Sequence, residues 1–139
     1  MTSEEKRAWI YAVIAAVVPV VYFASVLGQL GDTDAADIAY VRPLLTAIIG
    51  AIILNIVGNI VLAILSPKDA DRTDERDRQI NRFGEYIGYY VVSVVAVISM
   101  GLAMLEADYF WIANSLYLAF TLAALVSSVV KIVSYRRSF

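Results

Sequence analysis

The chain has 139 residues, of which 60% are hydrophobic, with a mean hydropathy of +0.72 and a formal net charge of -2. It contains no cysteine and no histidine, which excludes disulfides, thiolate nucleophiles and metal or proton-transfer sites built on those side chains. This composition is more apolar than that of an ordinary soluble domain and is typical of a membrane protein.

Four apolar stretches are each long enough to cross a bilayer. A helix needs about 20 apolar residues to span roughly 30 Å of hydrocarbon, with its backbone groups bonded internally. The stretches cover residues 8–30, 43–65, 83–105 and 109–130. We therefore expect an all-α, polytopic four-helix bundle that forms a single domain over residues 1–139.

The distribution of positive charge predicts the orientation. Ten of the eleven Lys and Arg residues lie at the amino end, within residues 66–82 or at the carboxyl end, and only Arg42 lies in the connections on the other side. Cytoplasmic connections of multi-pass proteins carry an excess of Lys and Arg. We therefore expect a protein of the cell (inner, cytoplasmic) membrane with both termini in the cytoplasm.

The second span carries a stripe of small and amide side chains at every fourth residue, which places them on one helix face. The stripe consists of Ala47, Ala51, Asn55, Asn59 and Ala63. One interpretation is that the two amides form hydrogen bonds between helices. The other is that they line a polar site for an ion or ligand near mid-membrane. The first is the simpler, because neither side chain is ionisable.

Residues 66–82 hold ten of the chain's charged residues. From about Asp71 onward their spacing favours a helix stabilised by ion pairs one turn apart, with Asp71 or Thr73 as its cap. We therefore expect the third helix to project about two turns into the cytoplasm. The expected pairs are Asp74–Arg78, Arg72–Glu75, Glu75–Arg78 and Arg82–Glu85.

The projecting part of the third helix is the expected docking surface for a partner. The five basic residues of residues 66–82 are matched by five acidic ones, which argues against direct binding of nucleic acid. Calcium loops starting at Asp32 or Asp69 would lack the required glycine and glutamate, so we expect no metal. The candidate docking residues are Asp74, Arg76, Arg78 and Arg82.

The third span opens with Gly84 and Gly88 in a GxxxG spacing, which permits close helix packing within the protomer or in a dimer. Glu85 is the one acidic residue expected inside a span, and such a carboxylate is a functional candidate by default. A structural ion pair with Arg82 is the alternative. Tyr86, Tyr89 and Tyr90 are expected to surround the carboxylate.

The fourth span contains a second small-residue line, formed by Ala119, Ala123 and Ser127, which is suited to close packing. Its first turns also carry an amide. The polar candidates inside the membrane are Asn55, Asn59, Glu85, Tyr86, Tyr89 and Asn114.

Several segments resemble an uncharacterised family of small bacterial four-helix integral membrane proteins. They are Ser-Pro-Lys-Asp-Ala-Asp at 66–71, the Asp-Glu-Arg-Asp motif at 74–77 before the third helix, and the segments 111–114 and 131–133. The resemblance covers roughly residues 40–137. It implies the four-helix fold and, because such proteins are often encoded near small helix-turn-helix regulators, a link to regulation or envelope stress. It implies no activity.

Two functions fit these observations. The first is a non-enzymatic membrane protein that presents its charged cytoplasmic helix to a protein partner or to a second copy of itself. The alternative is a small dimeric transporter or channel that uses Glu85, the Asn55/Asn59 stripe and Asn114. We expect no catalytic residues and no cofactor, since Tyr, Ser and carboxylates form no recognisable catalytic set in this sequence.

Overall fold

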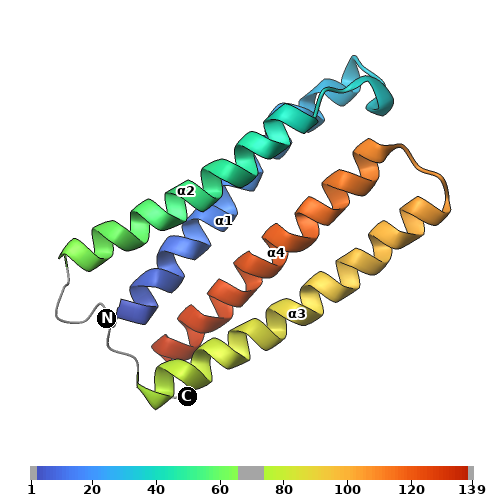
Figure 1. Cartoon of the computed structure of the whole chain (residues 1–139). Coiled ribbons are helices and arrows are strands. Elements are labelled where there is room, and N and C mark those ends of the chain that lie inside the picture. The colour runs from blue at the N-terminus through green and yellow to red at the C-terminus, as the bar shows by residue number, and fades with distance from the viewer. Residues whose placement is uncertain (1–2, 66–73, 138–139) are drawn as a thin grey trace.

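In a computed structural model, the chain is described over residues 3–65 and 74–137. These residues form four α-helices, with two short 3-10 turns between the first and the second (Figure 1). The elements are α1 (Ser3–Leu27), η1 (Gly28–Gly31), η2 (Ala35–Asp37), α2 (Val41–Leu65), α3 (Glu75–Met104) and α4 (Tyr109–Arg136). The described ranges contain no β-strand, so the expected all-α class is confirmed.

The helices are arranged in the order α2, α1, α4, α3. Helix α1 packs against both α2 and α4, and α3 packs against α4 (Figure 1). Helix α4 contributes the most buried residues, whereas Leu62 is the one buried residue of α2. Both chain ends lie at the same end of the molecule, which we call the termini end; the turns between α1 and α2 and between α3 and α4 form the loop end.

All four helices are long and apolar enough to cross a membrane. Their most apolar windows have mean hydropathies between 2.0 and 2.6. Large apolar side chains also remain on the outer faces of the helices, for example Val20, Ile64 and Met104. This length and composition are typical of a multi-pass membrane protein, whose exposed apolar side chains face lipid.

Two helices extend further at the termini end than their apolar stretches predict. Helix α1 begins at Ser3 instead of residue 8, and α4 ends at Arg136 instead of residue 130. The two extensions contact each other, and Arg136 lies 3.2 Å from the buried carboxylate of Glu5. At the loop end, α2 begins two residues before Pro43, which lies in the first turn, where its missing N–H leaves no intrahelical bond unmade.

The start of α3 corrects the predicted cap. Asp74 is the N-cap, and it forms a capping box with Asp77: the Asp77 N–H donates to Asp74 Oδ1 at 2.8 Å, and the Asp74 N–H donates to Asp77 Oδ2 at 3.1 Å. The expected caps Asp71 and Thr73, like Arg72 and its expected pair with Glu75, lie outside the described residues. Residues 75–82 form about two helical turns before the apolar part of α3, as expected. We call these residues the α3 extension.

An aromatic and aliphatic cluster fixes the helices at the loop end. Its buried members are Tyr22, Val26, Ile38, Phe110 and Tyr117. Ile38 follows the turn η2, so the connection between α1 and α2 folds back onto the bundle. This cluster holds α1 and α4 together at the loop end.

Candidate functional site

The glycines of the GxxxG motif lie in the contact between α3 and α4. A Cβ atom on Gly84 would lie 2.6 Å from Lys131 Cγ and 3.1 Å from the Ser127 carbonyl oxygen, and one on Gly88 would lie 3.2 Å from Ser127 Cβ. The predicted line Ala119, Ala123 and Ser127 is buried in α4. The motif therefore packs within the protomer, which was one of its two expected uses.

Glu85 forms an ion pair with α4. Lys131 Nζ donates to Glu85 Oε1 at 2.7 Å. The expected pair with Arg82 is not made among the described residues. The Glu85 side chain is 74% exposed and that of Lys131 17%, so the carboxylate lies at the rim of the bundle and not in its interior.

The tyrosines that follow Glu85 do not surround its carboxylate. The hydroxyls of Tyr86 and Tyr90 lie 3.1 Å apart and bond to each other, and Tyr89 is largely exposed. The expectation that these tyrosines satisfy Glu85 is therefore wrong. Tyr86 and Tyr90 lie on the exposed side of α3, where their polar ends and apolar rings suit the boundary between lipid and water, and Tyr89 lines a recess between α1, α3 and α4.

The amides of α2 bond within their own helix. Asn55 Nδ2 donates to the Ala51 carbonyl at 2.9 Å, and Asn59 Nδ2 donates to the Asn55 carbonyl at 2.8 Å. Neither makes the expected bond to another helix within the described protomer. The close approach of α1 and α2 occurs beside the stripe, at Gly58, where a Cβ would lie 3.0 Å from Ile10 Cγ2.

Asn114 is a buried link between α1 and α4. Its Oδ1 accepts a hydrogen bond from the Tyr22 hydroxyl, and its Nδ2 donates to the Phe110 carbonyl at 2.7 Å. With both ends bonded inside the core, this amide serves packing. The polar candidates thus lie in three separate places: along α3, at and beside its contact with α4; in the α2 stripe; and in the loop-end core.

Arg76 anchors the α3 extension to the end of α4. Its Nη2 donates to the Tyr135 carbonyl at 3.0 Å and lies 3.5 Å from those of Ser134 and Arg137. Its guanidinium also lies over the Tyr135 ring, 5.4 Å from the centroid. A cation is favourable here because the last carbonyls of a helix lack intrahelical partners and carry partial negative charge.

A second anchor connects Asp77 with Tyr135, whose hydroxyl donates to Asp77 Oδ1. Asp77 is 4% exposed, and Ile80, one turn further along α3, is fully buried. Sequence reasoning missed this contact. The spacing of Asp74 and Asp77 could have indicated the capping box, but no local signal connects Asp77 with a tyrosine far along the chain.

Four residues of the α3 extension remain on its outer face. Glu75, Arg78, Gln79 and Arg82 are all exposed, and their spacing places them on one side of the helix. Arg78 and Glu75 lie 3.6 Å apart, the one predicted pair that is confirmed. We call these four residues the α3 charged face. Of the predicted docking residues, Arg78 and Arg82 belong to it, whereas Asp74 is the cap and Arg76 is an anchor.

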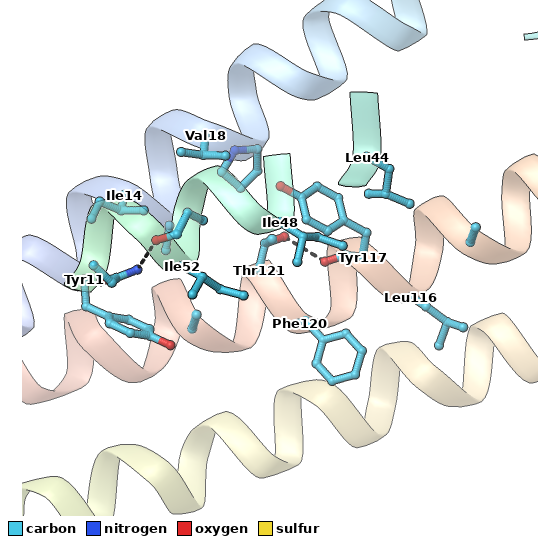
Figure 2. Close-up of a pocket in the computed structure, with 16 residues that line it drawn as sticks. Tyr11, Ile14, Val18, Leu44, Ile48, Ile52, Leu116, Tyr117, Phe120 and Thr121 are labelled. Atoms are coloured by element: carbon cyan, nitrogen blue, oxygen red, sulfur yellow. Dashed lines mark hydrogen bonds between the residues drawn. The ribbon is translucent and has the colours of Figure 1, made fainter. Parts of the chain in front are cut away.

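Two recesses lie between the helices. The apolar recess, of about 640 Å³, lies between α1, α2 and α4 (Figure 2). The polar recess, of about 620 Å³, lies between α1, α3 and α4 nearer the termini end. The apolar recess is lined mainly by aliphatic and aromatic side chains, including Ile14, Val18, Ile48, Ile52, Leu116 and Phe120. The polar recess is lined at one end by Glu4, Arg7, Asn81, Glu85 and Lys131.

No group of three or more acidic side chains suited to a metal ion occurs in residues 3–65 or 74–137. Comparison with protein-family models, curated proteins and solved structures finds no match. The functional assignment therefore rests on the geometry of the chain itself.

Proposed function

We propose that the chain is a non-enzymatic integral protein of a bacterial cytoplasmic membrane that presents the α3 charged face to a cytoplasmic protein partner. The observation that carries the proposal is the fixed position of the α3 extension. Arg76 and Asp77 attach it to the end of α4, while the charged residues on its outer face remain exposed. A surface held in this way is suited to recognition, because the cost of ordering it is met before a partner arrives.

The distribution of charge supports the cytoplasmic orientation. Ten of the eleven Lys and Arg residues belong to the termini, to α3 before its apolar part, or to the connection that precedes α3. The termini and the start of α3 lie at the same end of the molecule. By the positive-inside rule this end faces the cytoplasm.

The mixed signs of the α3 charged face favour a protein surface as its target. A polyanion would be attracted to Arg78 and Arg82 but repelled by Glu75. A protein with complementary alternating charges can satisfy all three, and such complementarity gives specificity more than affinity. A regulatory partner agrees with the resemblance described above.

Charge reversal tests the proposal. A variant with Arg78→Glu and Arg82→Glu is compared with the native chain and with Arg42→Glu, a matched reversal at the loop end. The three proteins are purified from membranes of the source cell after crosslinking, and captured proteins are quantified by mass spectrometry. We expect one protein that is captured by the native chain and by Arg42→Glu but is lost from the double variant at equal expression. Equal capture by all three contradicts the proposal. Arg76 is left unchanged because it anchors α4.

The transporter alternative receives less support. Asn55 lines the apolar recess, Glu85 the polar recess, and Asn114 is bonded inside the core. These residues form no common polar pathway among the described residues of one protomer. Unchanged ion or solute flux in liposomes containing Glu85→Gln would remove the remaining basis of this alternative.

A further inference from the structure

We propose that the two recesses form one groove that binds a zwitterionic phospholipid, such as a phosphatidylethanolamine, with its head group at the polar recess and an acyl chain in the apolar recess. This inference goes beyond the proposed function; it rests on the membrane embedding in that proposal but not on the cytoplasmic partner. It rests on the continuity of the groove, on its polarity and on the charges at its polar end.

The two recesses adjoin. Tyr11, Phe120 and Ala124 line both of them, so the recesses meet at these three residues of α1 and α4. Each recess falls within the range of about 300–1,000 Å³ that is usual for small-molecule sites. Figure 2 shows Ile48 and Ile52 of α2 facing Tyr117 and Phe120 of α4 across the apolar recess.

The groove changes from polar to apolar along its length. At the polar recess, Gly88, Ala123 and Ser127 line the packed contact between α3 and α4, and charged side chains lie toward the termini end. Further along, the lining is apolar apart from a few groups such as Asn55 and Thr121. A phospholipid in a bilayer has the same sequence of environments, with its head group near the helix ends and its chain at the helix centres.

The charges at the polar end come in two pairs of opposite sign. Glu4 and Arg7 lie 2.9 Å apart on α1, and Glu85 and Lys131 lie 2.7 Å apart across α3 and α4. A head group with one phosphate and one ammonium can place the phosphate beside Arg7 and Lys131 and the ammonium beside the two carboxylates. A purely anionic head group has no ammonium to place beside these carboxylates, and this difference selects against it.

A helix of a second copy is the other candidate occupant, and the groove favours the lipid. A membrane-spanning helix with its side chains is about 10–12 Å across and about 30 Å long, so its volume exceeds that of the two recesses of 640 and 620 Å³ taken together. A second copy would also cover the two ion pairs at the polar end with an apolar span, which carries a desolvation cost. A single acyl chain with a zwitterionic head group avoids both the excess volume and this cost.

Native mass spectrometry of the full chain tests the proposal. The protein is purified in detergent, stripped of lipid, and titrated with phosphatidylethanolamine or phosphatidylglycerol of identical chains. We expect one phosphatidylethanolamine per chain, bound about tenfold more tightly than phosphatidylglycerol, which corresponds to about 1.4 kcal/mol. The double variant Glu4→Gln with Glu85→Gln removes the carboxylates and should abolish this preference. Glu106→Gln, at the exposed loop end, is the matched control and should keep it.

A second variant tests the acyl part of the groove. Ala124→Phe places a bulky side chain where the two recesses meet and should reduce binding of both lipids about tenfold or more, while Ile64→Phe, on the exposed face of α2, should not. Equal or tighter binding of phosphatidylglycerol by the native chain overturns the proposal. So does a dimer that Ala124→Phe dissociates, since the groove would then belong to a second copy.

Discussion

Tyr135, in the last turn of α4, donates its hydroxyl to the buried carboxylate of Asp77, in the first turn of α3. The other oxygen of the same carboxylate accepts the backbone N–H of Asp74 and completes the helix cap. One side chain thus joins a local cap to a contact 58 residues away. The α3 extension cannot turn about its axis without breaking the contact with Tyr135.

Loss of the Asp77 carboxylate should destabilise the bundle. Asp77→Asn keeps the shape of the side chain but removes its charge, and hydrogen bonds to charged groups contribute about 1.5–3 kcal/mol. We expect a loss of that size in the free energy of unfolding, measured by denaturant titration in mild detergent. Glu75→Gln, an exposed change in the same turn of α3, should stay within about 0.5 kcal/mol of the native value.

A double-mutant cycle shows whether the effect of Asp77 passes through Tyr135. If it does, Tyr135→Phe and Asp77→Asn together will cost less than the sum of the single changes, with an interaction energy of about 0.5–3 kcal/mol. Strict additivity would mean that Asp77 acts through its cap alone.

Substitution by alanine should have opposite effects on stability at two glycines of α3, because Gly84 belongs to the packed GxxxG motif and Gly101 does not. Gly84→Ala brings a Cβ within 2.6 Å of Lys131 Cγ and 3.1 Å of a backbone oxygen, whereas a Cβ on Gly101 meets nothing within 4 Å. Overpacking costs about 1–3 kcal/mol, and Gly to Ala in an open helix position gains up to about 1 kcal/mol. Thermal unfolding should therefore move to lower temperature for Gly84→Ala and stay equal or rise for Gly101→Ala. Equal shifts for both would contradict the packed contact between α3 and α4.

The number of helices and the small-residue contacts could be predicted because both are local properties. Apolar length decides whether a helix can span a bilayer, and the spacing of Ala119, Ala123 and Ser127 places them on one face whatever the rest of the chain does. The hydrogen-bond partners of Glu85 and Tyr22 could not be predicted from the sequence. They lie 46 and 92 residues away, so they depend on which helices are neighbours.

The α2 stripe shows a different limit of sequence reasoning. An amide in a helix can donate to the carbonyl one turn earlier instead of to another helix, and Asn55 and Asn59 both do so. Periodicity fixes the face on which a side chain lies but not the direction in which its polar group points. Asn55 Oδ1 is buried without a hydrogen-bond partner among the described residues, and it lies at the apolar recess.

The hydrogen bond between Tyr22 and Asn114 predicts a small loss of stability for Tyr22→Phe and a larger loss for Asn114→Leu. Hydrogen bonds between membrane helices contribute about 0.6 kcal/mol on average and at most about 1.7 kcal/mol, so Tyr22→Phe should destabilise within that range. Asn114→Leu should cost more, because it leaves the buried Tyr22 hydroxyl without its acceptor. Unfolding in denaturing detergent measures both. Tyr109→Phe, which changes an exposed hydroxyl, is the control; an effect equal to that of Tyr22→Phe would contradict the role of the link.

The absence of cysteine makes the orientation directly measurable. Gln79 lies on the exposed α3 charged face and Asp34 on the exposed connection at the loop end, so either can be replaced by cysteine. The native chain gives no thiol background. A membrane-impermeant maleimide applied to cells with a permeabilised outer envelope should label Asp34→Cys at once and Gln79→Cys only after the inner membrane is opened. This follows from the excess of Lys and Arg at the termini end. The reverse pattern would place the α3 charged face outside the cell and leave no route to a cytoplasmic partner.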